Sequence, residues 1–407
     1  MSGLGGLTMI LQRDIAQDVL KGARYFPVVA LLGPRQSGKT TLAQNLFKHH
    51  RYVSLEDPDI RAAVEADPRT FLLTHAYEHG IIIDEFQRVP VLLSYIQTIV
   101  DKEQKPGFFI LTGSQNFLAN QAITQSLAGR ISIHTLLPLS IHELQANALL
   151  PNQVEQILYN GCYPAHYAKN IPPELLYRNY FQTYIERDVR QLAHVGDLST
   201  FQTFIGLCAS RIGQLLNLTA LGNECGISNT TAKRWLSILE ASYIVFTLQP
   251  YPSTPRLRRT GHTNFGKRLV KTPKIYFYDP GLACFLLNIK LEDLALSPYR
   301  GGLFESFILA DIFKWQYNYG KFAQVYFWRD KVGHEVDCLV QQGSHLLALE
   351  VKASRTISSR FFENLNYWNM LSEQNKKNSY IIFAGPSDQV TGYDRVKSWQ
   401  LLENILQ

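Results

Sequence analysis

The sequence lacks the features of secreted proteins, of membrane-spanning proteins and of small zinc-binding domains. Its 407 residues include five cysteines and no CxxC pair, so neither a disulfide framework nor a zinc knuckle is indicated. No apolar run approaches the ~18 residues of a membrane span, and no basic and then apolar leader opens the chain. These absences predict a soluble protein of the reducing cytoplasm, with no membrane partner.

Low-complexity tracts and internal repeats are also missing. Hydrophobic residues make up 46% of the chain and charged residues 18%, which is the balance of a folded globular protein. At ~100 to 200 residues per domain, a chain of this length should fold as several domains. The formal net charge is +6, and its distribution is more informative than its size.

Short apolar runs alternate with helical patterns in the first third of the chain. The runs are 28–32, 52–55, 81–83 and 108–111. Strands that alternate with helices in this way predict βαβ units and a parallel sheet covered by helices on both faces. The first domain, residues 1–140, is therefore expected to be α/β.

A glycine-rich loop follows the first predicted strand. Residues 33–40 fit GxxxxGK[ST], a pattern whose backbone N–H groups surround phosphates at the start of a helix. Lys39 is expected to reach the β and γ phosphates, and Thr40 to bind Mg²⁺. The predicted nucleotide-binding residues are Gly33, Pro34, Arg35, Gln36, Ser37, Gly38, Lys39, Thr40, Thr41 and Asp84.

Two acids end the strand predicted at 81–83. Asp84 is expected to hold Mg²⁺, and Glu85 to polarise the attacking water, which is the arrangement of a hydrolase. The next strand ends in Thr-Gly-Ser-Gln, where Ser114 or Gln115 could contact the γ phosphate and the water. An ordinary polar turn is the alternative at that position.

Six segments carry a resemblance to a known family. They are 26–41, 82–87, 111–114, 127–130, 184–189 and 276–279, and they resemble the AAA-type P-loop ATPases that carry a C-terminal DUF4143 region. The likeness covers nearly the whole chain. It implies ATP binding, and hydrolysis with Mg²⁺, by an AAA-type domain, and it names no substrate.

Such ATPases use an arginine to stabilise the transition state, from the same chain or from a neighbouring subunit. The candidates are Arg130, Arg187 and Arg190, and a donated arginine would require self-association. Alternatively, Arg187 and Arg190 pair with adjacent acids on an exposed helical face.

A winged helix-turn-helix is predicted within residues 211–274, after a helical connector over residues 141–210. Helices at 219–225 and 228–240 flank a turn at Gly226, and a strand at 243–248 follows. The stretch 251–274 then carries +7, against +6 for the whole chain, so the entire positive excess lies where a wing is expected. Its basic residues are Arg256, Arg258, Arg259, Lys267, Arg268, Lys271 and Lys274.

A basic cluster of this kind is a good ligand for the phosphate backbone of nucleic acid. The predicted partner is therefore nucleic acid, with DNA favoured over RNA. The alternative is that the winged helix and its basic loop dock on another protein, because helix-turn-helix geometry alone does not decide function.

The C-terminal domain, residues 275–407, is predicted as helix, three strands, helix and strand. The strand at 335–340 should place Glu335 and Asp337 on one face and Val336 and Cys338 on the other. Asp337, followed by Glu-Val-Lys at 350–352, has D…ExK spacing. Together with the order of elements, this resembles the PD-(D/E)XK restriction-endonuclease-like superfamily, although Val336 replaces the leading proline.

The chemistry of such a site is metal-dependent cleavage of phosphodiesters. Carboxylates hold Mg²⁺ or Mn²⁺ against the phosphate, and a lysine positions or deprotonates the water. The predicted catalytic residues are Asp337, Glu350 and Lys352, and the predicted metal ligands are Asp337, Glu350 and Glu305. The alternatives are an amphipathic strand whose acid and lysine merely pair, or a domain that binds nucleic acid or a protein without cutting.

Overall fold

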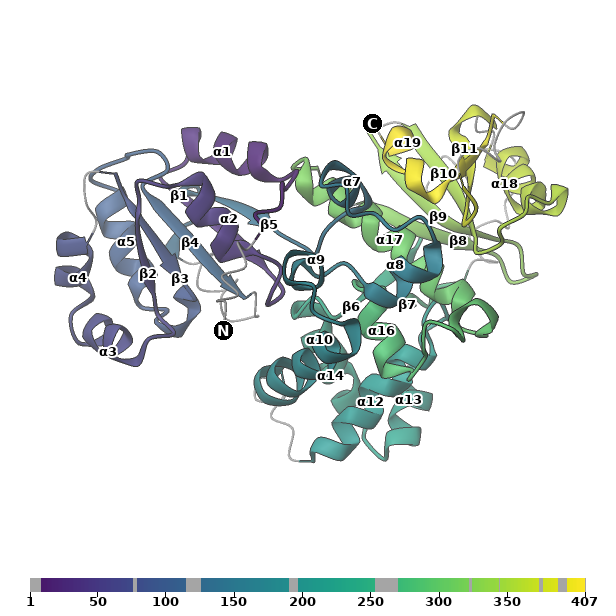
Figure 1. The fold of residues 1–407 in the computed structure, drawn as a ribbon, viewed down its shortest axis with the longest axis horizontal. Helices are drawn as coiled ribbons and strands as arrows, with labels where there is room; N and C mark the ends of the chain where they lie inside the picture. Colours follow the sequence, from purple (N-terminus) through teal and green to yellow (C-terminus); the bar gives the residue numbers. More distant parts are fainter. Residues whose placement is uncertain are drawn as a thin grey trace, which may run out of the picture.

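The computed structural model describes residues 9–75, 79–114, 126–189, 197–252, 270–321, 324–343, 345–372, 376–386 and 394–406. The chain forms two lobes, with the first five strands in one and the helices and strands from α8 onward in the other (Figure 1). Within the residues described, no helix is long and apolar enough to span a bilayer.

The first lobe is a five-stranded parallel sheet in the order β2-β3-β4-β1-β5. Its strands are β1 (Val28–Gly33), β2 (Arg51–Ser54), β3 (Ile81–Asp84), β4 (Phe109–Ser114) and β5 (Ile131–Thr135). The four predicted strands are confirmed. β5 was not predicted, although alternating apolar and polar residues are typical of a partly buried edge strand.

Two hydrophobic clusters cover the two faces of this sheet, as predicted. Along β1, Val28 and Ala30 face one cluster, whereas Val29 and Leu31 face the other. The second face is covered by α1 (Ala16–Tyr25) and α2 (Lys39–Leu46), and the first by α3 (Pro58–Ala66), α4 (Pro68–His75) and α5 (Leu92–Val100), with the short helix η1 (Phe86–Arg88) beside it. The buried central strands β1, β3 and β4 end in the polar loops that form the site.

A run of helices follows, as predicted for 141–210. They are α7 (Ile141–Ala146), α8 (Val154–Asn160), α9 (Pro164–Lys169), α10 (Pro173–Tyr180), the π-helical η2 (Phe181–Val189) and α12 (Leu198–Ser210). Pro164 and Pro173 stand at the first position of α9 and α10, where a missing N–H is harmless.

The helix-turn-helix order is also present. α13 (Leu218–Cys225) ends at Gly226, whose φ of 69° is left-handed, and Ser228 caps α14 (Asn229–Ala241) by accepting a hydrogen bond from the Thr231 N–H. β6 (Val245–Pro250) begins two residues later than predicted, because Tyr243 turns the chain with a φ of 54°. β6 pairs with β7 (Lys274–Phe277) as an antiparallel hairpin.

The C-terminal elements follow the predicted order. α16 (Pro280–Leu286) and η4 (Leu294–Leu296) lead to α17 (Arg300–Asn318), β8 (Val325–Arg329), β9 (Glu335–Gln342), β10 (His345–Lys352), η5 (Ser359–Phe362), α18 (Glu363–Ser372), η6 (Lys376–Asn378), β11 (Ser379–Phe383), β12 (Val396–Ser398), η8 (Trp399–Leu401) and α19 (Glu403–Leu406). The sheet order is β12-β11-β10-β9-β8-β6-β7, so the hairpin after the helix-turn-helix extends the C-terminal sheet.

One hydrophobic core runs from Leu137 to Leu406 and includes side chains of the helical connector, of α14 and of α17. A smaller core on the other face of the C-terminal sheet packs Trp328 and Ala348 against Trp368 of α18. The second lobe is therefore held together by packing across all three segments that the sequence separates.

Candidate nucleotide site and C-terminal acidic site

The loop between β1 and α2 has the backbone of a phosphate-binding loop. Gly33 and Gly38 have φ of 145° and 94°, and Gln36 between them has a φ of 61°. A Cβ on Gly33 would stand 2.2 Å from the Leu136 carbonyl oxygen, so no other residue fits there. Positive φ at these three positions lets nearby backbone N–H groups turn towards an anion.

Lys39 is buried inside this loop. Its Nζ donates to the carbonyl oxygens of Gly33 (3.1 Å) and Pro34 (2.7 Å). Burial lowers the pKa of Lys39 to about 8, and the nearby carboxylates of Glu85 and Asp84 oppose that shift. A dehydrated ammonium with only carbonyl partners is well prepared to bind a phosphate.

Thr40 and Asp84 meet across the sheet end, as predicted. Thr40 Oγ1 lies 3.2 and 3.1 Å from the two Asp84 carboxylate oxygens. Asp84 also accepts hydrogen bonds from the hydroxyls of Tyr52 (2.9 Å) and Thr112. Tyr52 and Thr112 were not predicted as site residues, although both lie in strands that neighbour β3.

Glu85 and Ser114 are also brought together. Ser114 Oγ lies 3.3 Å from Glu85 Oε2, and the Gln87 amide contacts both side chains, at 3.0 Å from Ser114 Oγ. Gln87 was not predicted as a site residue. Gln115, the alternative to Ser114, lies outside the described residues.

A cavity of about 580 Å³ opens over these residues. Its polar side is lined by Arg35, Gln36, Gly38, Lys39, Thr40, Thr41, Asp84 and Glu85. Its apolar side comes from the N-terminal segment, at Met9 and Ile10, and from the helical connector, at Ile171 and Leu176. The volume is within the usual range for small-molecule sites, and the polar and apolar halves suit a phosphate tail and a base.

Three family models match parts of this chain. Residues 25–145 match the family model described as "AAA domain". Residues 151–293 and 300–402 match two models described as domains of unknown function, DUF8612 and DUF4143. Residues 25–145 form an AAA-type P-loop ATPase domain.

Two relatives are the "Uncharacterized protein Rv2008c" of Mycobacterium tuberculosis and the "Uncharacterized protein Mb2031c" of Mycobacterium bovis. Each is 29% identical to this chain over 355 residues, which is 86% of this chain and 76% of the relative. The solved structure of the Walker-type ATPase PABY2304 of Pyrococcus abyssi aligns with a TM-score of 0.44 at 14% identity, covering 70% of this chain and 99% of its own. The assignment rests on the domain match and on the loop geometry.

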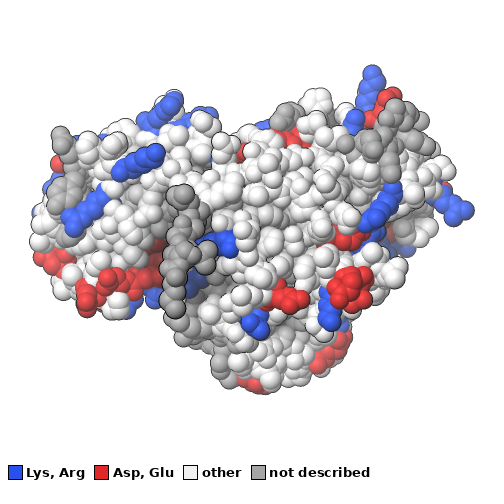
Figure 2. All heavy atoms as spheres, viewed as in Figure 1, with Lys and Arg blue, Asp and Glu red and all other residues white. Residues whose placement is uncertain are grey.

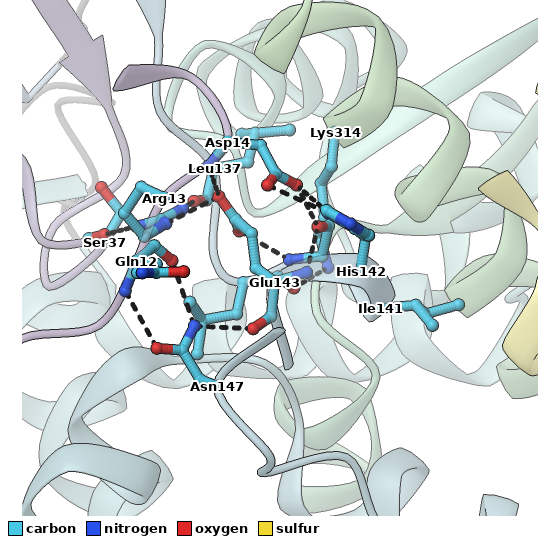
Figure 3. Close-up of polar contacts among 12 residues, drawn as sticks. Gln12, Arg13, Asp14, Ser37, Leu137, Ile141, His142, Glu143, Asn147 and Lys314 are labelled. Carbon is cyan, nitrogen blue, oxygen red and sulfur yellow. Dashed lines mark hydrogen bonds and ion pairs between the residues drawn. The ribbon is translucent and has the colours of Figure 1, made fainter. Parts of the chain in front are cut away.

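Arg13 links the P-loop of the AAA-type domain to Leu137 and to Glu143 of α7 (Figure 3). Its guanidinium donates to the carbonyl oxygens of Ser37 (2.7 Å) and Leu137 (2.6 Å) and pairs with Glu143 at 2.9 Å. Glu143 is buried and forms a capping box with Ser140 at the start of α7. The sequence analysis missed Arg13 and Glu143, which stand 130 positions apart.

Arg130 cannot complete the nucleotide site of its own AAA-type domain. Its carbonyl oxygen accepts a hydrogen bond from Val28 at the amino end of β1, whereas the P-loop follows the carboxyl end, roughly 16 Å away. Its side chain binds Asp101 and the Ala128 carbonyl oxygen. Donation to a neighbouring subunit stays a prediction, and the Arg187 side chain and Arg190 lie outside the description.

The predicted catalytic residues of the C-terminal domain, Asp337, Glu350 and Lys352, lie near one another. Asp337 Oδ2 accepts from the Val351 N–H at 2.8 Å, and Lys352 Nζ donates to Glu350 Oε1 at 2.6 Å. Burial raises the pKa of Glu350 to about 8, and Asp337 adds to the shift. Glu350 Oε2 is buried without a hydrogen-bond partner, so the donor set fits a divalent cation.

Glu305 does not join Asp337 and Glu350 in a tight cluster. Across the described residues, the trio whose ligand atoms lie within 4.8 Å of one another is Asp14, His142 and Glu403, at the edge of the Arg13 network. Glu305 instead contacts Lys274 and Tyr276. Burial raises the pKa of Glu305 to about 7, and Lys274 opposes that shift.

The predicted face of Val336 is wrong. Val336 packs with Trp328 and Leu339 in the smaller core, whereas Cys338 lies in the main core on the opposite face. The pairs Tyr326 with Leu339 and Trp328 with Val336 show that β9 contains one extra residue there. This β-bulge breaks the alternation beside Asp337, and bulges often re-aim a side chain in this way.

The basic stretch is only partly described. Lys271 is exposed, but Lys274 is buried and pairs with Glu305 and Glu335, so Lys274 is not a surface residue of a wing. The other five basic residues lie outside the described ranges. α14 divides as predicted, with Trp235 and Leu239 buried and Lys233 and Arg234 exposed. On the face drawn in Figure 2, the visible Lys and Arg are scattered and acids gather at the lower left.

Proposed function

We propose that the AAA-type domain binds ATP with Mg²⁺ and hydrolyses it. The observation that carries this proposal is the 3.1 Å contact between Thr40 Oγ1 and Asp84 in a cavity that also contains Lys39. Thr40 and Asp84 would hold Mg²⁺, which supplies charge neutralisation at the β and γ phosphates. Lys39 binds the same phosphate oxygens with its ammonium.

Glu85 is the residue proposed to accept the proton of the attacking water. Ser114 and Gln87 hold its carboxylate and so fix the direction in which the water is activated. The apolar side of the cavity would receive the base of ATP.

Phosphate release and nucleotide binding test this proposal together. Wild type is expected to release phosphate from ATP in Mg²⁺, Lys39→Ala to lose binding, and Glu85→Gln to keep binding while turnover falls by about 10² to 10⁴. Equal phosphate release from wild type, Lys39→Ala and Glu85→Gln would contradict the proposal.

We further propose that ATP turnover is coupled to nucleic-acid binding, and that the C-terminal region is a nuclease-like domain beside a winged helix. The orphaned Glu350 oxygen next to Lys352 favours a metal-dependent phosphodiesterase. Exposed Lys233 and Arg234 on α14 favour a DNA backbone contact. The second candidate is a nucleotide-driven switch whose C-terminal domain binds a protein or nucleic acid without cutting, and the pairing of Glu305 with Lys274 favours it.

DNA binding at two salt concentrations tests the proposed contact with the phosphate backbone. Affinity for a generic duplex should fall steeply with salt, and less steeply in the double variant Arg258→Ala, Arg259→Ala. Strand breaks that require Mn²⁺ and vanish in Asp337→Ala support the nuclease. DNA binding without breaks supports the switch, and salt-independent binding contradicts both versions of the coupling.

The same proposal includes self-association. Arg130 lies too far from the P-loop of its own chain, so it can act only on the nucleotide of a neighbouring copy. Arg130→Ala should then lower turnover only at protein concentrations at which the chain associates.

A further inference from the structure

The four acids at the C-terminal site fall into two halves. In the first half, Lys274 Nζ lies 3.1 Å from Glu305 Oε1 and contacts Glu335 Oε1. The Tyr276 hydroxyl also donates to Glu305. Lys274 is 3% exposed, and its ammonium lies 5.5 Å from the centre of the Phe327 ring. Every group in this half already has a partner of opposite charge or a hydrogen-bond donor.

In the second half, one carboxylate oxygen of Glu350 has neither a cation nor a hydrogen-bond donor beside it. Glu350 is 2% exposed, and its Oε1 accepts from Lys352 at 2.6 Å and from Asn364 at 3.4 Å. Its Oε2 has no partner, which is costly for a buried carboxylate. Asp337 lies close enough to destabilise the Glu350 anion. This half therefore lacks a positive charge beside Glu350 Oε2, whereas both acids of the first half have a cationic partner.

We propose that Lys274 is a built-in cation that takes the place of a second metal ion, so that the C-terminal site binds one divalent ion, on Asp337 and Glu350. This inference deepens the proposed function of that site and rests on it. In a two-metal site, two ions about 3.5–4 Å apart share the carboxylates. Here the ammonium of Lys274 contacts both Glu305 and Glu335, Arg329 pairs with Glu335 at 3.1 Å, and these positive charges repel a second ion from that half.

The position of Lys274 in β7 keeps its ammonium beside Glu305 and Glu335. It begins β7, where it pairs with Leu248 of β6 and bridges to Leu215, so its backbone is fixed by neighbours on both sides. Burial alone would lower the pKa of Lys274, but Glu305, Asp337 and Glu335 raise it above its ordinary value. The side chain is thus tethered, charged and enclosed.

A Mn²⁺ titration of the full-length, nucleotide-free protein tests the inference by stoichiometry. All proteins carry His142→Ala, so that the Asp14, His142 and Glu403 cluster does not contribute ions. We expect one Mn²⁺ in this background, none after Glu350→Gln, and two after Lys274→Met. The matched control Lys271→Met removes an exposed lysine three positions away and should keep one ion.

Several outcomes would overturn the inference. One is a folded Lys274→Met protein that still binds one ion, and another is a Lys274→Arg protein that binds two. If Lys274→Met does not fold, the Lys274-containing protein still decides: two ions, one lost in Glu305→Gln and one in Glu350→Gln, contradict the inference, and so does the absence of any ion. Strand breaks are scored separately, so a protein that binds one ion and does not cut DNA retains the inference and loses the nuclease.

Discussion

At the scale of residues, two of the buried lysines, Lys39 and Lys274, show how the same side chain is prepared for different tasks. Lys39 has only carbonyl oxygens as direct partners, and burial lowers its pKa to about 8. Lys274 touches two carboxylates, which raise its pKa in spite of burial. Lys39 can therefore gain an anionic partner from a ligand, whereas Lys274 already has its partners.

Glu350 should make the stability of the protein depend on pH. Burial raises its pKa from 4.5 to about 8, so between these values the folded protein holds a proton that the unfolded chain releases. The resulting stability is fully present below pH ~4.5 and is lost as the pH rises through ~8. In EDTA, Glu350→Gln should gain stability relative to wild type between about pH 5.5 and 8.5, on the order of a few kcal/mol.

Urea unfolding at both pH values measures this difference. Glu363→Gln, an exposed acid on α18, is the control and should leave the pH dependence of wild type unchanged. A constant difference between Glu350→Gln and wild type would contradict the buried, protonated carboxyl.

Site residues were predictable where they follow one another in the chain. The P-loop, Asp84 and Glu85 are local patterns tied to strand ends, and the structure gathers them as expected. Arg13 was missed because its partner Glu143 is 130 positions away, and one isolated basic residue in a sequence carries no sign of a distant acid. Lys274 was instead predicted as a basic residue of the wing, because its partner Glu305 is 31 positions away.

At the scale of elements, the extra residue in β9 explains why the faces predicted for that strand were wrong. A strict two-residue period predicted one face for Val336 and Cys338, and the bulge separates them. The order of helices and strands was nevertheless predicted, because apolar periodicity survives a single inserted residue. Bulges depend on the partner strand, so the sequence of β9 alone could not reveal it.

The start of α7 is an element whose stability should depend on one carboxylate. Glu143 accepts hydrogen bonds from the N–H groups of Asp14 and Ser140, both at 2.9 Å, besides its ion pair with Arg13. Glu143→Ala leaves a buried guanidinium unpaired and should cost about 3–5 kcal/mol of unfolding free energy. Ser140→Ala removes only the cap and should cost about 1 kcal/mol. Urea unfolding that finds equal costs would contradict the central role of Glu143.

At the scale of the whole molecule, α17 lies between the two candidate sites. Its Asp311 accepts a hydrogen bond from the Ile141 N–H of α7 at 2.8 Å, and its Lys314 donates to the Leu139 carbonyl oxygen at 2.9 Å. Less than two turns before Asp311, the same helix carries Glu305 of the acidic site. The contacts of Arg13, α7 and α17 thus form a continuous path between the P-loop and the C-terminal sheet (Figures 1 and 3).

Arg13 should matter for turnover although it contacts the loop only through a backbone oxygen. Arg13→Gln loses the charged bond to Ser37, and kcat/KM for ATP should fall by about 10- to 150-fold, since such a bond is worth about 1.5–3 kcal/mol. Arg13→Lys keeps the charge but cannot reach all three partners, and should fall between wild type and Arg13→Gln. Steady-state kinetics that match wild type in both variants would show that the link is structural only.

The central claim is that the Thr40, Asp84 and Lys39 geometry makes this chain an ATPase that acts with its C-terminal site. Its most direct test records phosphate release and strand breaks in one reaction, with plasmid, ATP and Mg²⁺ or Mn²⁺, for wild type, Lys39→Ala and Glu350→Ala. We predict phosphate release that is lost in Lys39→Ala and kept in Glu350→Ala, with any strand breaks lost in Glu350→Ala. Phosphate release from wild type no greater than from Lys39→Ala would contradict the account.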